Sequence, residues 1–448
     1  MPEGKLPEPI LEMARAYMAK EAIPGLGIAW VEGDTWAAGG LGKRSLEDGL
    51  SVDADTLFPL ASITKSFTAA LALLLEEEGL LALTQSPADI LPDFRVLPEG
   101  AAQAMTLQML LQHLSGLGRT GHLDPDAGAS FSSREELARA LSSYTLQTAP
   151  GETWSYSNEG YSVAGHVLER AAGQAYEELV EELLLKPLDL LNTTPYIQEW
   201  RESPQGARGY RLLRKREEPL WEPVEPLPIA PASTPAGRLS STPRDMARYV
   251  RAMLQGWRGI LHESEKRAYP FGSTGWGYGL GWFYQPGPKG TIFHHGGNQR
   301  GFAHEMWIFP AEGKALVLLS NLTYADLKPL VEEIYRWAEG VPLPSPKDAR
   351  SAFVPSPSFT DEGLTGRYTA PQGVVEILEG KGNPGGLLPY RWEMKEPPLV
   401  EEGEALPIGE RLFFLLEGRR AGMPLYFTRE GLLLAGNLYR KVSSSASW

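Results

Sequence analysis

Residues 59–65 of the chain read PLASITK, in which Ser62 stands three positions before Lys65. No other lysine of the chain has a serine at that spacing. Residues three apart share one face of an α-helix, so the lysine amine can lie beside the serine hydroxyl. A serine is a weak nucleophile until a neighbouring group takes its proton, and an amine can do so near neutral pH. The pair is therefore a nucleophile with its activator, or else a polar pair on an exposed helix face.

The segment after this pair favours the catalytic interpretation. Residues 67–75 read FTAALALLL and are apolar nearly all round, which is typical of a buried helix. A lysine in the first turns of such a helix has lost water, and desolvation lowers the pKa of its amine toward the range where it can act as a base. We therefore expect Ser62 and Lys65 to be catalytic.

The composition narrows the classes of function. The chain has 448 residues, 42% hydrophobic and 22% charged, as expected for a globular protein of two or more domains. Its net charge of −14 and lack of basic runs argue against nucleic acid and anionic membranes as partners. The absence of cysteine excludes disulfides, thiolate metal sites and a cysteine nucleophile. The N-terminus has no secretory-signal pattern and no segment is long and apolar enough to span a bilayer, so we expect a cytoplasmic protein.

Strand patterns occur at both ends of the first three quarters of the chain. Near the N-terminus, a helix at about 8–20 precedes two apolar runs that predict a hairpin over residues 25–40. The middle is mostly helical and loop-like, with a Pro/Arg-rich surface excursion over 201–235. Strand patterns return before an amphipathic helix at 327–338, in residues 279–284, 291–295, 304–309 and 314–320. This order predicts an α/β (α+β) domain over residues 1–340, with helices flanking one antiparallel sheet built from both ends and a helical lobe inserted.

The last quarter of the chain has a different pattern. A Pro-rich stretch at residues 341–358 predicts a linker. In residues 359–448, short apolar segments alternate with turns, which is typical of a small antiparallel barrel or sandwich. The chain has no nucleotide-binding glycine loop, and we expect no cofactor.

A second candidate element is the run WSYSN at residues 154–158, with Tyr156 and Asn158 two positions apart. Besides a nucleophile, acyl transfer needs a group that relays the proton and donors for the oxyanion. A tyrosine close to a cationic lysine has a lowered pKa because the positive charge favours the phenolate, so Tyr156 could act as base or proton shuttle. The alternative is an aromatic surface loop with an asparagine cap.

A third candidate element is the run FHHGGNQRGF at residues 293–302. A strand that ends in histidine and two glycines can bring its backbone against a ligand. His294 or His295 could instead bind a metal. The chain has no His-Glu-x-x-His helix, however, and its other histidines lack close ligand spacing, so we expect no metal site. For His294, a core or surface histidine without a catalytic role is the alternative.

Together, the three elements resemble the serine β-lactamase and penicillin-binding-protein superfamily, in particular its class C β-lactamase-like branch with esterases and D-amino-acid-specific peptidases. Related members carry Ser-x-x-Lys and Lys-Thr-Gly motifs, with Tyr-x-Asn and His-x-Gly as forms of the second and third motifs. The matching residues are Ser62 with Lys65, Tyr156 with Asn158, and His295 with Gly297. His295 is chosen because the family's motif runs six residues from its histidine to the glycine of a Gly-aromatic pair. The resemblance extends over roughly residues 8–340, and the C-terminal segment resembles the lipocalin-like domain appended to some members.

The resemblance implies a role for each motif residue. Ser62 would attack a carbonyl and form an acyl-enzyme, while Lys65 and Tyr156 would share the role of base. Asn158 would orient Lys65 or the substrate amide. The backbone N–H groups of Ser62 and Asn298 would form the oxyanion hole.

Two residues of the third element bear on the choice of substrate. His295 stands where many β-lactamases have a lysine, which keeps a hydrogen-bond donor but makes the positive charge pH-dependent. This change shifts the expectation from β-lactam turnover toward esterase or peptidase work. Arg300 could receive a substrate carboxylate, because a guanidinium suits bidentate binding of that group. An exposed surface arginine is the alternative.

The resemblance thus implies a cofactor-independent serine hydrolase that cleaves a small amide or ester, with a small-molecule or short-peptide substrate, and a homo-oligomer is possible. The choice between β-lactam, D-amino-acid peptide and ester stays open. A non-catalytic scaffold of the same fold is the alternative, although an intact set of Ser62, Lys65 and Tyr156 weighs against it. An α/β-hydrolase esterase would need a Gly-x-Ser-x-Gly elbow, which the chain lacks.

Overall fold

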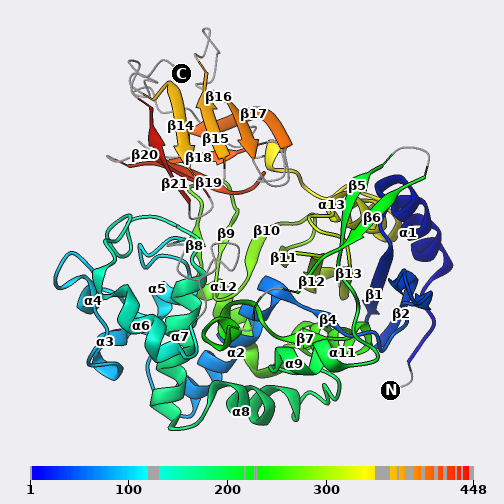
Figure 1. Ribbon diagram of the computed structural model, residues 1–448, viewed down its shortest axis with the longest axis horizontal. Helices are drawn as coiled ribbons and strands as arrows, with labels where there is room; N and C mark the ends of the chain where they lie inside the picture. The colour runs from blue at the N-terminus through cyan, green and yellow to red at the C-terminus, as the bar shows by residue number, and fades with distance from the viewer. Residues whose placement is uncertain are drawn as a thin grey trace.

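A computed structural model describes residues 3–119, 131–215, 218–226, 228, 230–348, 364–370, 373–378, 387–394, 399–407, 412–416, 421–428, 431–434 and 437–442. These residues form an α/β body and, after it, a β-barrel, which Figure 1 shows against one end of the body.

Nine antiparallel strands form the sheet of the body, in the order β3-β2-β1-β13-β12-β11-β10-β9-β8. The two ends of the body meet where β1 pairs with β13, with Leu26 opposite Ser320. This pairing confirms the predicted sheet built from both ends. The strands are β1 (Gly25–Glu32), β2 (Thr35–Ser45), β3 (Leu50–Ser51), β8 (Tyr269–Pro270), β9 (Gly277–Tyr278), β10 (Phe283–Pro286), β11 (Thr291–Gln299), β12 (Phe302–Phe309) and β13 (Lys314–Ser320).

The strand predicted at 279–284 is wrong over most of its length, because residues 279–282 form the turn between β9 and β10 and only 283–284 lie in a strand. Gly281 has a φ of +77° within this turn. A Cβ at this position would lie 2.7 Å from the carbonyl oxygen of Lys65, so the turn passes directly against the candidate lysine's helix. A left-handed residue in such close contact with backbone has to be glycine. The apolar pattern alone does not reveal this turn, because both of its flanks are buried.

Helices cover both faces of the sheet (Figure 1). One face packs against α1 (Glu8–Glu21) and α13 (Lys328–Glu339), with Ile10, Leu318 and Ile334 in their common core. The other face packs against α2 (Thr64–Glu77) and α11 (Pro243–Leu254), and a helical lobe lies beyond it. The remaining helices are α3 (Pro87–Ile90), α4 (Ala101–Ala104), α5 (Leu107–Leu111), α6 (Arg134–Ala140), α7 (Asn158–Ala172), α8 (Tyr176–Val180), α9 (Ile197–Glu202), α10 (Thr234–Gly237) and α12 (Ile260–Lys266).

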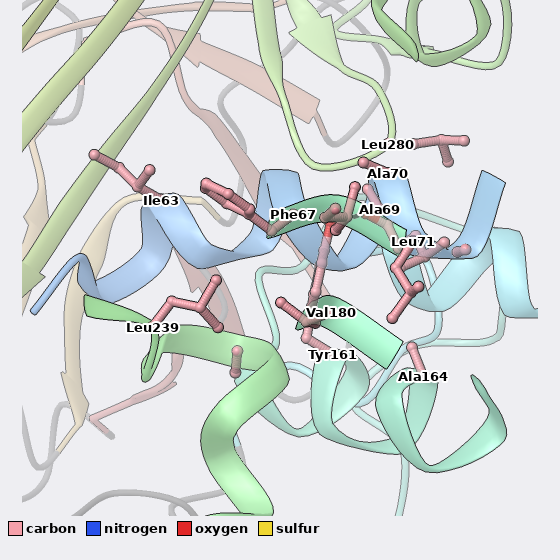
Figure 2. Packing of buried hydrophobic residues seen from close by; sticks show 14 of the residues in the cluster. Ile63, Phe67, Ala69, Ala70, Leu71, Tyr161, Ala164, Val180, Leu239 and Leu280 are labelled. Carbon is pink, nitrogen blue, oxygen red and sulfur yellow. Dashed lines mark hydrogen bonds between the residues drawn. The ribbon is translucent and has the colours of Figure 1, made fainter. Parts of the chain in front are cut away.

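Helix α2 lies at the centre of this second core. All its residues from Thr64 to Leu75 are buried, as the apolar run predicted. Figure 2 shows Phe67 and Leu71 of α2 among side chains from α7, α8 and the turn before β10. A helix enclosed on all sides gives a rigid base for groups at its N-terminal end. Among the described residues, no helix is both long and apolar enough to cross a membrane.

The excursion predicted over residues 201–235 contains a small hairpin of β5 (Tyr210–Arg214) and β6 (Leu220–Pro223). The indole N–H of Trp221 donates to the carbonyl oxygen of Ala22 at 2.8 Å and fastens the hairpin to the body. Nearby, β4 (Phe58–Pro59) pairs with β7 (Ser240–Ser241) just before the Ser62 turn. Charged residues flank and interrupt the two strands, so the sequence shows no alternating apolar pattern that would predict them.

The C-terminal segment forms a closed antiparallel barrel of eight strands, which confirms the predicted all-β fold. Aromatic and aliphatic side chains such as Trp392, Phe413 and Tyr439 fill its interior. The predicted linker and the start of the domain at residue 359 fall largely on residues 349–363, outside the described part. The strands are β14 (Gly366–Ala370), β15 (Gly373–Ile377), β16 (Leu388–Met394), β17 (Leu399–Pro407), β18 (Leu412–Leu415), β19 (Pro424–Phe427), β20 (Gly431–Leu434) and β21 (Asn437–Lys441).

Candidate active site

Ser62 lies in a tight turn at the start of α2. The turn is the 3₁₀ segment Ala61–Ile63, which continues directly into the helix. Ala61 has a φ of +49°, a left-handed conformation that is costly for a residue with a side chain. Backbone strain of this kind is concentrated at functional sites, where the surrounding structure holds it in place. The turn therefore fixes the Ser62 hydroxyl at the end of a buried helix.

Lys65 follows one helical turn later and is fully buried. Its Nζ lies 3.1 Å from Ser62 Oγ, 2.9 Å from Asn158 Oδ1 and 2.6 Å from the carbonyl oxygen of Ala236. The last two oxygens only accept hydrogen bonds, so each takes one N–H of the amine. In the neutral amine these two bonds use both N–H groups. The lone pair is then left for the third neighbour, Ser62 Oγ.

The surroundings of Lys65 favour this neutral form. Burial lowers the pKa of Lys65 well below its ordinary value, and the positive charge of Arg119 lowers it further. The negative charge of Glu159 acts in the opposite direction with a smaller effect. A neutral amine beside a serine hydroxyl has the properties of a general base.

Tyr156 reaches the same serine from a distant part of the chain. Its hydroxyl donates to Ser62 Oγ at 2.8 Å, and the ring centroid lies 4.8 Å from Lys65 Nζ. The Ser62 hydroxyl oxygen is therefore within hydrogen-bond distance of both the amine and the phenol. With a neutral lysine, these contacts form a chain in which the phenol donates to the serine and the serine donates to the amine.

The loop that carries Tyr156 is held by α7 and by His113. The Ser157 hydroxyl caps α7 by accepting from the Gly160 backbone N–H at 2.9 Å, and Asn158 is the first residue of the helix. The Ser157 backbone N–H donates to Nδ1 of His113 at 3.0 Å, and the His113 ring lies 4.2 Å from the Tyr156 ring. Burial lowers the pKa of His113 well below its ordinary value, so Nδ1 remains an acceptor. His113 was not among the predicted site residues.

Strand β11 brings the third element against the Ser62 turn. A Cβ on Gly297 would lie 2.4 Å from the carbonyl oxygen of Leu60, so only a glycine allows this approach. Asn298, the next residue, is exposed and lines the same cavity as Ser62. The structure thus places Gly297 and Asn298 beside the nucleophile turn, where the resemblance implied an oxyanion donor.

His295 is buried on β11 and also lines this cavity. Its Nδ1–H donates to the carbonyl oxygen of Gly296 at 2.7 Å, so Nε2 accepts from the Tyr278 hydroxyl at 3.1 Å. Burial, and then the charge of Lys65, lower the pKa of His295 to about 3. The imidazole is therefore neutral near pH 7 and its one N–H is already used. The sequence analysis expected His295 to be a hydrogen-bond donor to the substrate, with a charge that depends on pH. The structure differs because His295 is buried away from water, which the sequence does not show.

Ser62 lines a cavity of about 320 Å³. Tyr156, His295 and Asn298 line it from the body. The C-terminal barrel supplies a further part of the wall, through Trp392, Met394, Ala421, Gly422, Met423, Asn437 and Tyr439. An apolar cluster that includes Trp276 of the body and Phe414 of the barrel holds the two parts together. The barrel is therefore part of the enclosure around Ser62.

Positive charge reaches this cavity from residues that were not predicted. Arg119 and Lys328 both line it, together with the carboxylates of Glu305 and Asp326, and the Arg119 guanidinium lies 5.2 Å from the Tyr156 ring centroid. Arg300 is exposed on the turn between β11 and β12 and is not among the lining residues. Its role in binding a carboxylate stays a prediction, and Arg119 and Lys328 are better placed for it.

Comparisons with known proteins show the family of the chain. The family model "Beta-lactamase" matches residues 11–337. The chain is 26% identical over 330 residues to "Protein flp" of Staphylococcus aureus. The matched region covers 71% of this chain and 63% of flp. The chain therefore spans less than two thirds of the length of this curated relative.

Three solved structures show how far the likeness extends. A D-stereospecific amidohydrolase from Streptomyces sp. is 26% identical with a TM-score of 0.58, over 71% of this chain and 97% of its own. An octameric penicillin-binding protein homologue from Pyrococcus abyssi is 21% identical with a TM-score of 0.64, over 97% of this chain and 99% of its own. The second likeness, in fold alone, includes the barrel. A class C beta-lactamase, 20% identical with a TM-score of 0.62 over 72% of this chain and 93% of its own, is similar in fold alone. Since the family model covers well over half of the chain, the protein belongs to the Beta-lactamase family.

Proposed function

We propose that the protein cleaves a small amide or ester through an acyl-enzyme on Ser62. The observation that carries this proposal is the position of Ser62 Oγ, 3.1 Å from a buried amine and 2.8 Å from a phenol, at the wall of a cavity. Amine and phenol supply a base and a proton relay, the groups that acyl transfer needs besides the nucleophile. Among the described residues, no carboxylate lies at ion-pair distance from the buried Lys65 amine, and a binding scaffold would gain nothing from such a costly group, which disfavours the non-catalytic alternative.

In the proposed reaction, Lys65 is the base for acylation. Ser62 Oγ attacks the substrate carbonyl carbon while its proton passes to Lys65 Nζ, and the carbonyl oxygen takes up the negative charge. The backbone N–H groups of Ser62 and Asn298 would stabilise this oxyanion, and one such donor is worth about 2.7–4 kcal/mol of barrier. When the carbon–nitrogen or carbon–oxygen bond breaks, Tyr156 delivers a proton to the leaving group and regains one from Lys65. Water then hydrolyses the ester on Ser62 by the reverse relay.

The size of the cavity supports a short substrate. About 320 Å³ is near the lower end for small-molecule sites. A neutral His295 gives no charge to a substrate carboxylate, whereas the wall holds two cations, Arg119 and Lys328, and two carboxylates, Glu305 and Asp326, which suit a substrate with both charges. Among carboxylate-bearing substrates, a short peptide therefore fits the site better than a β-lactam held at the third motif. The related D-stereospecific amidohydrolase makes D-amino-acid amides the first class to test.

The test is a hydrolysis panel on the full-length protein. It compares p-nitrophenyl acetate, p-nitroanilides of D- and L-amino acids, and a penicillin, for the wild type and for Ser62→Ala. We expect ester or D-amide turnover that Ser62→Ala lacks, and slower turnover of the penicillin. Equal activity of both proteins toward every substrate in the panel would favour the scaffold instead.

A further inference from the structure

A second cavity, of about 360 Å³, lies beside α10 and is separate from the one at Ser62. Its lining comes from α6, α7, the start of α9 and the ends of α10, and includes Arg134, Tyr196 and Arg238. The residues that line it have no part in the proposed reaction. Two largely buried arginines at one cavity call for an explanation, because charged groups in protein interiors are normally paired.

Arg134 has such a pairing. Its guanidinium binds Glu169 and Glu177, and its side chain is 8% exposed. These carboxylates raise the pKa of Arg134, and Arg134 in turn helps to lower that of Glu169 to about 2. Both carboxylates, Glu169 and Glu177, are therefore paired with Arg134 and do not neutralise the second arginine, Arg238.

Arg238 is equally buried, but none of the described carboxylates pairs with it. It is 7% exposed, and its Nε donates to the Ser233 hydroxyl at 3.0 Å. Within the described part of the chain, no carboxylate lies at ion-pair distance from its guanidinium, and the two terminal nitrogens make no hydrogen bond. Burial, and then the positive charge of Arg201, lower the pKa of Arg238 to about 10. A buried cation held without a partner is costly, and an anionic ligand would remove that cost.

We propose that this cavity binds a small oxyanion, a carboxylate or a phosphate, on the guanidinium of Arg238. A guanidinium presents two parallel N–H groups that match the oxygens of either anion. Further donors line the same cavity. The Ser133 hydroxyl accepts from the Glu136 backbone N–H and keeps its own proton to donate, and the Tyr196 phenol is partly exposed there. The volume suits a metabolite-sized anion.

The position of Arg238 connects this site to the candidate catalytic lysine. The Arg238 backbone N–H closes α10 by donating to Thr234, while its side chain holds Ser233 at the other end of the helix. Between them, the Ala236 carbonyl oxygen accepts from Lys65 Nζ at 2.6 Å. An anion on Arg238 would therefore stiffen the helix that positions Lys65. An effect on turnover rests on the proposed function, whereas binding itself does not.

The experiment measures the melting temperature of the full-length protein against sodium phosphate and, separately, sodium acetate, with sodium chloride at equal ionic strength as reference. We expect a saturable rise for the wild type with at least one of the two anions, because a ligand that binds only the folded state stabilises it. The two series tell which oxyanion the site prefers. Arg238→Gln should abolish the saturable part. Arg211→Gln, at an exposed arginine on the hairpin, should keep it.

A second measurement does not depend on whether the Arg238→Gln variant folds. Calorimetric titration of the wild type alone should give a saturable isotherm with the anion that raises the melting temperature. Arg238→Lys keeps the charge but not the paired N–H groups, so it should raise the apparent Kd about tenfold. The proposal is overturned if neither anion exceeds chloride for the wild type, or if Arg238→Gln responds as the wild type does. Loss of ester hydrolysis in Ser62→Ala tests the proposed function separately and has no bearing on anion binding.

Discussion

Gly297→Ala tests whether the close approach of β11 fixes the nucleophile. The added methyl group would lie 2.4 Å from the carbonyl oxygen of Leu60, two residues before Ser62. Ordinary carbon–oxygen contacts begin at about 3.3 Å, so the strand or the turn must move by roughly 1 Å. A misplacement of about 1 Å at a reacting group can lower the rate about a hundredfold. We therefore expect kcat/KM to fall about a hundredfold, with about 1–3 kcal/mol lost in the free energy of unfolding from overpacking.

The assay is p-nitrophenyl ester hydrolysis, with circular dichroism and thermal melting to establish that the variant is folded. Gly290→Ala is the matched control. Its Cβ would lie 3.3 Å from Ala311 Cβ on an exposed part of the surface, where the neighbour can move. The control should keep the wild-type kcat/KM. A folded Gly297→Ala protein within about threefold of the wild type would refute the idea that this contact sets the position of Ser62.

Three further predictions concern the proton relay and the stability of the lobe. Tyr156→Phe removes the hydroxyl that lies 2.8 Å from Ser62 Oγ and should lower kcat about 10²–10⁴-fold with little change in KM, measured by steady-state kinetics. Because the pKa of Lys65 is lowered, the neutral amine forms as pH rises; kcat/KM should climb to a plateau well below pH 10.5, and a profile still rising there would contradict a depressed pKa. Arg134→Ala leaves two carboxylates of the lobe without their cation and should cost about 3–5 kcal/mol in urea unfolding. Because the pKa of Glu169 is about 2, the pairing in the wild type should be lost only as pH falls from about 4.5 toward 2, and Arg134→Ala should lack this acid limb.

Features set by local spacing could be predicted from the sequence. The Ser62–Lys65 spacing, the apolar run of α2 and the strand patterns at both ends give the buried helix and the shared sheet directly, because side-chain periodicity determines which face is buried. Among the barrel strands, β17 lacks a regular apolar pattern, since Glu401, Glu402 and Glu404 interrupt it. Its place depends on pairing with β16 and β18.

Features that depend on distant contacts could not be predicted. The use of Trp392 and Tyr439 as cavity wall follows from how the barrel docks on the body, and no local pattern encodes docking. The same holds for His113, whose role depends on its contacts with the Ser157 backbone and the Tyr156 ring. His295 is neutral because its side chain is buried away from water, and only the packed structure reveals this burial.

The central claim is that Ser62 becomes acylated with Lys65 as its base. The most direct measurement is intact-protein mass spectrometry after incubation with a fluorophosphonate, followed by peptide mapping. We predict a single adduct on Ser62 in the wild type, no adduct in Ser62→Ala, and an adduct that forms at least a hundredfold more slowly in Lys65→Ala. A folded wild-type protein that gains no mass at Ser62, or a Lys65→Ala protein labelled at the wild-type rate, would contradict the account.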